Sequence, residues 1–137
     1  MTTYDLAKMD HGNYDLPMYN DEFDGVKENC LTYIVGMFEK QVLDSNYSFD
    51  IKKYNGCKKE FESVWSHPGY LPNEPWFVRN PNGESEDDGL ILTAAYDLNT
   101  QSTKLLIIDP IEMKTKQEFE LPFRVPWSFH SSYWPKK

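Results

Sequence analysis

Positive charge is in short supply in this chain. Its 137 residues include 14 lysines and arginines against 22 aspartates and glutamates, which gives a formal net charge of −8. Binding to a phosphate backbone needs clustered basic side chains that displace counterions, and the terminal pair Lys136 and Lys137 is too small a cluster. The composition therefore argues against a nucleic-acid-binding protein and against attachment to an anionic membrane surface.

Long apolar runs are also missing. No run approaches the ~20 residues that a membrane-spanning helix requires. Residues 1–17 lack the basic start, apolar core and small-residue cleavage site of a secretory signal peptide. We therefore expect a soluble protein without a transmembrane segment, with the cytoplasm as its default location.

Cysteine and histidine are both scarce. The two cysteines, Cys30 and Cys57, are too few for a disulfide framework and lack the paired spacing of a zinc site, so we expect each to be a free, partly buried thiol. Of the 3 histidines, His11 and His67 lie in a polar leader and a proline-rich loop, where solvated side chains are expected. His130 lies near the C-terminus.

Sustained helical periodicity is absent too. Prolines at positions 110, 122, 126 and 135 would interrupt a helix in the last quarter of the chain. Aromatic residues make up 15% of the sequence, and their side chains favour pleated, half-buried surfaces. These features predict an all-β fold.

The first half of the chain predicts an irregular leader followed by a β-rich segment. Residues 1–28 are polar and irregular, with at most one short extended piece around Tyr14–Met18, whereas residues 29–137 carry the strand signals. The first of these signals is the run LTYIVGMF, which is dense in β-branched and aromatic residues. We place the boundary between leader and β-rich segment at residue 28.

An antiparallel meander is predicted next. The run NYSFDIKKYN alternates apolar and polar residues, which indicates a strand with one solvent-exposed face. The dipeptide Asn55-Gly56 is typical of a two-residue hairpin turn. The returning run places Phe61 and Trp65 at a spacing that predicts a shared face.

The second half predicts a further sheet. Three prolines and a glycine in residues 66–75 exclude regular structure and form a loop that brings Glu74 to the head of the next strand. Four strand-like runs separated by short polar turns then follow: WFVRN, GLILTAAYD, KLLIIDP and KQEFELP. They predict an up-and-down sheet of sandwich or propeller type. Leu90–Tyr96 and Leu105–Ile108 are almost continuously apolar, which predicts burial on both faces.

Several motifs in this chain resemble the C-terminal part of the carotenoid cleavage oxygenase family. In the family's order and spacing, the chain has NEPWFV after a proline loop, EDDGLIL at a turn, the apolar run KLLIIDP, and VPWSFH near its end. Upstream, NYDLPMYN and CLTYIVGMF match family segments more loosely. The resemblance is strongest to the animal β-carotene oxygenases and the retinoid isomerohydrolase.

The resemblance implies a seven-bladed β-propeller that holds one Fe(II) ion with four histidines, oriented by three glutamates. Such a protein cleaves a double bond of a carotenoid or retinoid with O₂. By motif match, His130 takes the position of the last iron-ligating histidine and Glu74 that of a glutamate that orients a ligand. Neutral imidazole suits ferrous iron, and a carboxylate that accepts the other ring N–H fixes the tautomer.

The chain also departs from the family pattern. Ser131 stands where the family has a glycine, and the blades that carry the other three iron-ligating histidines are missing. The antiparallel meanders would form a partial β-propeller of about one and a half blades with exposed strand edges. We therefore expect the chain to be inactive alone, to share Fe(II) with histidines outside it, and to self-associate or pair with partner strands through these edges.

Two functional hypotheses follow from the resemblance. In the first, the chain is the C-terminal part of an Fe(II)-dependent carotenoid or retinoid oxygenase. In the alternative, it is a truncated, non-catalytic paralogue that binds a carotenoid, a retinoid or a protein partner. The aromatic residues that could serve such binding are Trp65, Trp76, Trp127 and Trp134.

Two other patterns favour structural interpretations. Carboxylates crowd Glu86–Gly89, but their spacing does not match a calcium-binding loop, so we predict a turn before a buried strand. Ser128 and Ser131 lie close to His130 in sequence, but neighbours on a strand point to opposite faces, so no catalytic triad is expected.

Overall fold

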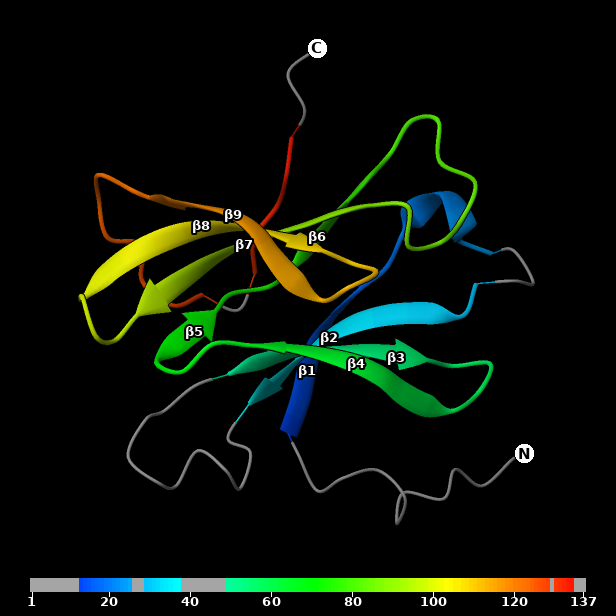
Figure 1. Ribbon diagram of the computed structural model, residues 1–137, viewed down its shortest axis with the longest axis horizontal. Helices are drawn as coiled ribbons and strands as arrows, with labels where there is room; N and C mark the ends of the chain where they lie inside the picture. Colours follow the sequence, from blue (N-terminus) through cyan, green and yellow to red (C-terminus); the bar gives the residue numbers. More distant parts are fainter. Residues whose placement is uncertain (1–12, 26–28, 38–48, 129, 135–137) are drawn as a thin grey trace.

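The described part of this protein forms two antiparallel β-sheets (Figure 1). The computed structural model describes residues 13–25, 29–37, 49–128 and 130–134. Within these ranges the helical structure is a single 3₁₀ turn, η2 (Asp21–Phe23), so the all-β prediction is confirmed. No helix of the described part is long and apolar enough to cross a membrane.

The first sheet is the predicted meander. Its strands are β1 (Asn13–Met18), β2 (Leu31–Met37), β3 (Asp50–Asn55) and β4 (Glu60–Ser66). They lie in the order β1-β2-β3-β4, and each is antiparallel to its neighbour. The extended piece predicted around Tyr14–Met18 is β1, whereas the boundary at residue 28 stays a prediction.

The turn between β3 and β4 differs from the predicted two-residue hairpin. Asn55 pairs with Glu60, so four residues lie between the paired positions. The Oδ1 atom of Asn55 accepts hydrogen bonds from the backbone N–H groups of Cys57 and Lys58, at 3.1 and 3.0 Å. An asparagine that bonds the backbone two residues ahead stabilises such a turn by itself. The prediction was wrong because this side chain caps a longer loop.

Strand β3 also lacks the predicted solvent-exposed face. Lys52 is 9% exposed and Lys53 is 5% exposed, which is unusual for lysine. Both ammonium groups have polar partners: the Lys53 Nζ lies 2.8 Å from the Oδ2 of Asp87, and the Lys52 Nζ lies 3.1 Å from the hydroxyl of Tyr14. These contacts offset the cost of removing the charges from water.

A bulge separates two residues that were predicted to share a face. Trp65 pairs with Ile51, and the register shifts before Phe61 pairs with Tyr54. Because side chains alternate along β3, positions 51 and 54 point to opposite faces. Trp65 therefore joins the core, while the Phe61 ring packs 5.1 Å from that of Tyr54 on the other face.

The second sheet contains the four predicted strands and one more. Its strands are β5 (Tyr70–Pro72), β6 (Trp76–Arg79), β7 (Gly89–Asp97), β8 (Ser102–Asp109) and β9 (Lys114–Glu120). Both β5 and β6 pair with β7, one along each half of it, and β8 and β9 follow on its other side. The proline loop, expected to lack regular structure, therefore contributes the short strand β5.

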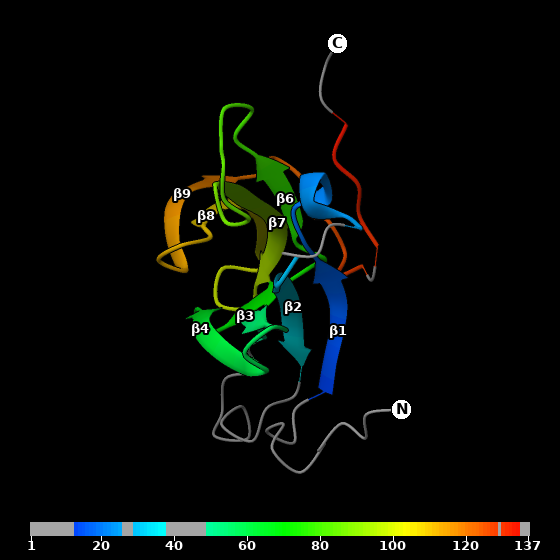
Figure 2. The same cartoon turned by 90° about the vertical axis from the view of Figure 1, so that its right-hand side faces the viewer.

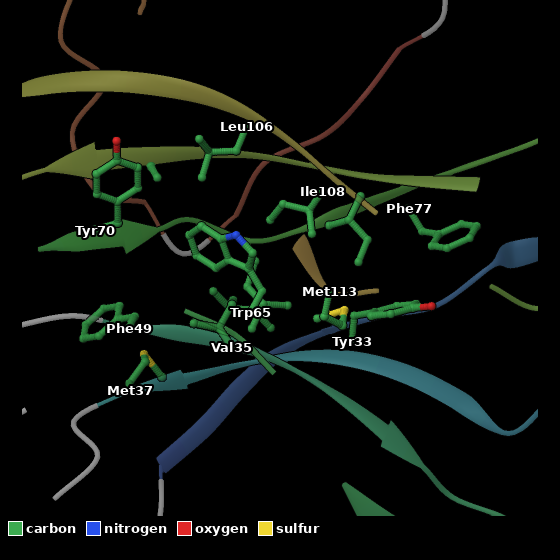
Figure 3. Packing of buried hydrophobic residues seen from close by; sticks show 14 residues of the cluster. Tyr33, Val35, Met37, Phe49, Trp65, Tyr70, Phe77, Leu106, Ile108 and Met113 are labelled. Carbon is green, nitrogen blue, oxygen red and sulfur yellow. The ribbon is translucent and has the colours of Figure 1, made fainter. Parts of the chain in front are cut away.

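The core lies between the two sheets, which form separate layers in Figures 1 and 2. Tyr33 of the first sheet stacks on Phe77 of the second at 5.6 Å between ring centroids. The indole N–H of Trp65 donates to the Thr115 hydroxyl across the interface at 2.8 Å. Figure 3 shows Trp65 between the sheets with other core side chains. Each large apolar side chain buried here contributes about 1.5–3 kcal/mol.

Strands β7 and β8 are fully buried on one face only. Burial alternates along Gly89–Asp97: Ile91, Thr93 and Ala95 are at most 3% exposed, whereas Leu92 and Ala94 between them are half-buried. The same holds for Leu106 and Ile108 against Leu105 and Ile107. The predicted burial on both faces is therefore wrong for this chain, because the described residues bury a single face of this sheet.

The two cysteines are not free thiols. Cys30 and Cys57 form a disulfide bond across 27 positions in the sequence. Cys30 precedes β2, and its carbonyl oxygen accepts a 2.7 Å hydrogen bond from the backbone N–H of Gly56 in the β3–β4 turn. This pairing brings the two Cα atoms to 5.2 Å, within the range that a disulfide spans. Cysteine count alone misses such a contact.

Candidate functional site

The proline loop between β5 and β6 is fixed to the central strand of its sheet. The backbone N–H of Asn73 donates to the carbonyl of Ala94 at 2.8 Å, and the Asn73 carbonyl accepts from the Thr93 hydroxyl at 2.9 Å. Asn73 is 4% exposed and Thr93 is 3% exposed. This loop therefore presents Glu74 from a rigid base.

The C-terminal segment, residues 122–128 and 130–134, returns to this loop after β9. Pro122 and Pro126 have no N–H to donate, so this stretch is poorly suited to a strand ladder. It is attached at its start by Thr103, whose hydroxyl accepts a hydrogen bond from the Val125 N–H at 2.9 Å. Side-chain hydrogen bonds hold this segment in place of the backbone hydrogen bonds that join neighbouring strands.

Three consecutive residues, from the end of β5 into this loop, hold the C-terminal segment. Each accepts a hydrogen bond from it: the Pro72 carbonyl from the Trp127 indole at 3.1 Å, the Asn73 Oδ1 from the Ser128 N–H at 3.1 Å, and the Glu74 Oε2 from the Ser131 N–H at 2.7 Å. These pairs lie 55 to 57 positions apart in sequence. The contacts place His130 beside Glu74.

Glu74 and His130 face each other. The Nδ1 atom of the imidazole lies 3.6 Å from Oε1 of the carboxylate, longer than a standard hydrogen bond. The Glu74 side chain is 14% exposed, whereas that of His130 is 85% exposed. The structure thus brings together the two residues singled out by the sequence, with the imidazole reaching outward from the described part of the chain.

The serine hydroxyls near His130 both donate hydrogen bonds to backbone carbonyls. The Ser128 hydroxyl donates to the His130 carbonyl at 3.0 Å, and the Ser131 hydroxyl donates to the Glu74 carbonyl at 3.1 Å. Both bonds hold backbone groups. The side chain of Ser131, which stands where a glycine was expected, therefore reinforces the attachment of the segment.

Of the other two histidines, the structure describes only His67, which contacts Pro68 and Tyr70. His67 is exposed, as expected, and its ring lies 4.0 Å from that of Tyr70. His11 lies outside the described residues. Among the described residues, no three histidine, cysteine, aspartate or glutamate side chains are grouped as a metal site would require. The part of the chain described here therefore offers the imidazole of His130 as a single nitrogen donor at Glu74.

The acidic stretch Glu86–Asp88 forms a turn that leads into β7 at Gly89, as predicted. The Glu86 carboxylate accepts hydrogen bonds from the backbone N–H groups of Cys30 and Leu31. The Asp88 Oδ1 accepts from the Asn80 side chain at 3.0 Å. These carboxylates face different partners instead of a common centre, which does not fit a calcium loop.

Comparison with known proteins identifies the family. A family model described as retinal pigment epithelial membrane protein matches residues 2–135. This chain belongs to the carotenoid oxygenase family. The match covers almost the whole chain, so membership does not depend on the short motifs alone.

Curated relatives are much longer than this chain. Human mitochondrial carotenoid-cleaving dioxygenase is 32% identical over 133 residues, which cover 96% of this chain and 21% of the relative. A carotenoid dioxygenase from Neurospora crassa is 33% identical over 72 residues, covering 52% of this chain and 12% of the relative. The chain thus spans about a fifth of the length of the first relatives it matches.

Solved structures of the family share the fold. Cobalt-substituted apocarotenoid oxygenase from Synechocystis aligns with a TM-score of 0.76 at 20% identity, over 90% of this chain and 26% of that one. A mutant of the same enzyme aligns with a TM-score of 0.73 at 20% identity, over 87% and 25%. The two sheets are therefore part of a β-propeller that the described residues do not close, which confirms the predicted partial propeller.

Proposed function

We propose that this chain is the C-terminal part of an Fe(II)-dependent carotenoid or retinoid oxygenase, in which His130 is one iron ligand and Glu74 orients its ring. The observation that supports this role is the position of the Glu74 carboxylate. Its Oε2 is held by the Ser131 N–H, while its Oε1 faces the His130 Nδ1 at 3.6 Å. A carboxylate held in this way favours the tautomer with hydrogen on Nδ1 and a free lone pair on Nε2.

The residues present fit one ligand position of such an iron site. Neutral imidazole suits ferrous iron, and an all-histidine ligand set leaves the ion accessible to O₂. The outward-facing ring could share an ion with histidines of other propeller blades, while Glu74 stays largely buried. When bound, iron would supply the activation of O₂ for cleavage of a polyene double bond; the role of this chain is to hold and orient one imidazole.

Binding of Co²⁺ to the 137-residue chain tests the proposal. Weak binding through one imidazole is expected, with loss of the binding in His130→Ala. Removal of a carboxylate that orients a ligand typically lowers metal affinity about 10–100-fold, so Glu74→Gln should show a drop of this kind. His67→Ala is the matched control, because His67 is exposed and its ring packs against that of Tyr70. Tight binding that survives His130→Ala would contradict the one-ligand role.

The His130→Ala variant also distinguishes the oxygenase proposal from the alternative function. A non-catalytic paralogue that binds a carotenoid or retinoid would bind the pigment equally well with His130→Ala. Addition of a purified carotenoid to both proteins, followed by visible absorption, tells the two apart. Loss of pigment binding in the variant would favour a metal-dependent site instead.

A further inference from the structure

We propose that Asn73 and Thr93 are positioning residues for His130, connected to it by hydrogen bonds that run from the buried face of β7 to the C-terminal segment. The proposal rests on the proposed function in treating His130 as a ligand. The connection itself involves only described residues of this chain. Neither Asn73 nor Thr93 was singled out by the sequence.

The first step of the connection lies in the core of the second sheet. The Thr93 hydroxyl donates to the Asn73 carbonyl at 2.9 Å, in a buried hydrogen bond. The Asn73 N–H donates to the carbonyl of Ala94 at 2.8 Å. Both backbone polar groups of Asn73 are therefore bonded to β7, and its side chain is directed from this fixed backbone.

The second step reaches the C-terminal segment. The Asn73 Oδ1 accepts the Ser128 N–H at 3.1 Å, and the Ser128 hydroxyl donates to the His130 carbonyl at 3.0 Å. On the other side of the histidine, the Ser131 N–H is held by Glu74. The backbone that carries the imidazole is thus fixed both before and after His130.

The position of His130 depends on the hydrogen bonds that flank it more than on packing of its own side chain. Its side chain is 85% exposed, so packing contacts contribute little. The segment also lies outside the strands of the second sheet, which ends with β9. A metal ligand must be held close to its productive geometry by the groups that surround it. Asn73 supplies that support before the histidine, as Glu74 does after it.

Amide hydrogen exchange and NMR spectra of the 137-residue chain test the connection without any metal. Asn73→Leu removes the Oδ1 acceptor at similar volume, so exchange of the Ser128 N–H should accelerate about tenfold. The His130 ring resonances should shift as well. Asn73→Asp keeps an acceptor at the same place and should restore slow exchange.

A second pair of variants keeps the test decisive if Asn73→Leu does not fold. Thr93→Val removes the hydroxyl from the same volume and should accelerate Ser128 exchange by a smaller factor, whereas Thr93→Ser keeps the hydroxyl and should match the wild-type chain. The amide of Leu106 in the core serves as the internal reference for global stability. Unchanged Ser128 exchange and unchanged His130 resonances in Thr93→Val and in a folded Asn73→Leu would overturn the proposal.

Metal binding distinguishes this inference from the proposed function. With Co²⁺ as the probe, Asn73→Leu should lower affinity about tenfold if His130 is a ligand. Unchanged Co²⁺ binding in His130→Ala would refute the ligand role and leave the exchange result intact. Loss of Co²⁺ binding in His130→Ala, together with unaltered exchange in the Asn73 and Thr93 variants, would refute only the positioning role.

Discussion

The Glu86 carboxylate accepts a hydrogen bond from the backbone N–H of Cys30, 56 positions earlier in the chain. It also accepts one from the next residue, Leu31, at the start of β2. Glu86 therefore joins the turn before β7 to the start of β2, next to the disulfide-bonded Cys30. This contact ties the second sheet to the first outside the apolar core.

Loss of the Glu86 carboxylate should destabilise the fold. Hydrogen bonds to a charged acceptor are stronger than neutral ones, and a partly buried N–H left without a partner costs about 1–3 kcal/mol. We expect Glu86→Ala to lower the free energy of unfolding by an amount in this range, measured by urea denaturation. Glu84→Ala, an exposed carboxylate two positions away, is the control. Equal effects of the two substitutions would contradict the role of Glu86.

The pair Asp87 and Lys53 should make stability sensitive to acid. Burial by itself would raise the pKa of Asp87, but the hydrogen bond and charge of Lys53 outweigh burial and hold the pKa below its ordinary value of 3.8. A carboxyl group whose folded pKa is depressed stabilises the fold above the unfolded pKa, and this contribution is lost as pH falls through the folded value.

We therefore expect the free energy of unfolding to decrease as the pH is lowered below about 4, and to decrease less steeply in Asp87→Asn. Denaturation curves between pH 2 and pH 6 measure this directly. The side chain of Lys53 is only 6% exposed, so added salt should screen the pair weakly. If the free energy of unfolding of the variant decreased with pH as steeply as that of the wild-type chain, the pair would not contribute.

The disulfide should be a major source of stability. Its cysteines are 27 positions apart, and a loop of this length corresponds to about 3–4 kcal/mol in the chain-entropy model. Cys30→Ser and Cys57→Ser should each lower the free energy of unfolding by a similar amount, and reducing agent should have no further effect on either. Two titratable thiols in the unreduced native chain would contradict the bond.

The redox state of these cysteines also tests the cytoplasmic location, which stays a prediction. Disulfides persist mainly in oxidising compartments. Thiol alkylation in intact cells, followed by mass spectrometry, would measure the state of Cys30 and Cys57. Oxidised cysteines in the native chain would favour an oxidising compartment, and reduced ones would favour the cytoplasm.

Two neighbouring leucines on β8 should differ in importance. Leu106 is fully buried between the sheets, whereas Leu105 is half-buried on the other face. Leu106→Ala should cost about 2–5 kcal/mol, the range for a buried leucine, and Leu105→Ala clearly less. Urea denaturation of both variants measures the difference. Equal costs would mean that the second face is covered, for instance by self-association, which sedimentation would then reveal.

Much of the fold could be predicted from local patterns. The apolar runs at Leu90–Tyr96 and Leu105–Ile108 became β7 and β8, and the prolines after β9 ended the ladder. The short motifs around Glu74 and His130 indicated the family and singled out a pair that the structure places at 3.6 Å. These features follow from residue types and spacings within a few positions, which backbone preferences and side-chain alternation translate directly into structure.

Contacts between distant segments decided the rest. The buried lysines of β3, the bulge that separates Phe61 from Trp65, and the Cys30–Cys57 bond each require a partner from another strand or turn. The link from Thr93 through Asn73 to Ser128 likewise joins residues 20 and then 55 positions apart. By itself the sequence determined where strands form and which family the motifs resemble. Only the tertiary structure decided which polar groups meet, because hydrogen bonds and ion pairs depend on positions in space that no local pattern encodes.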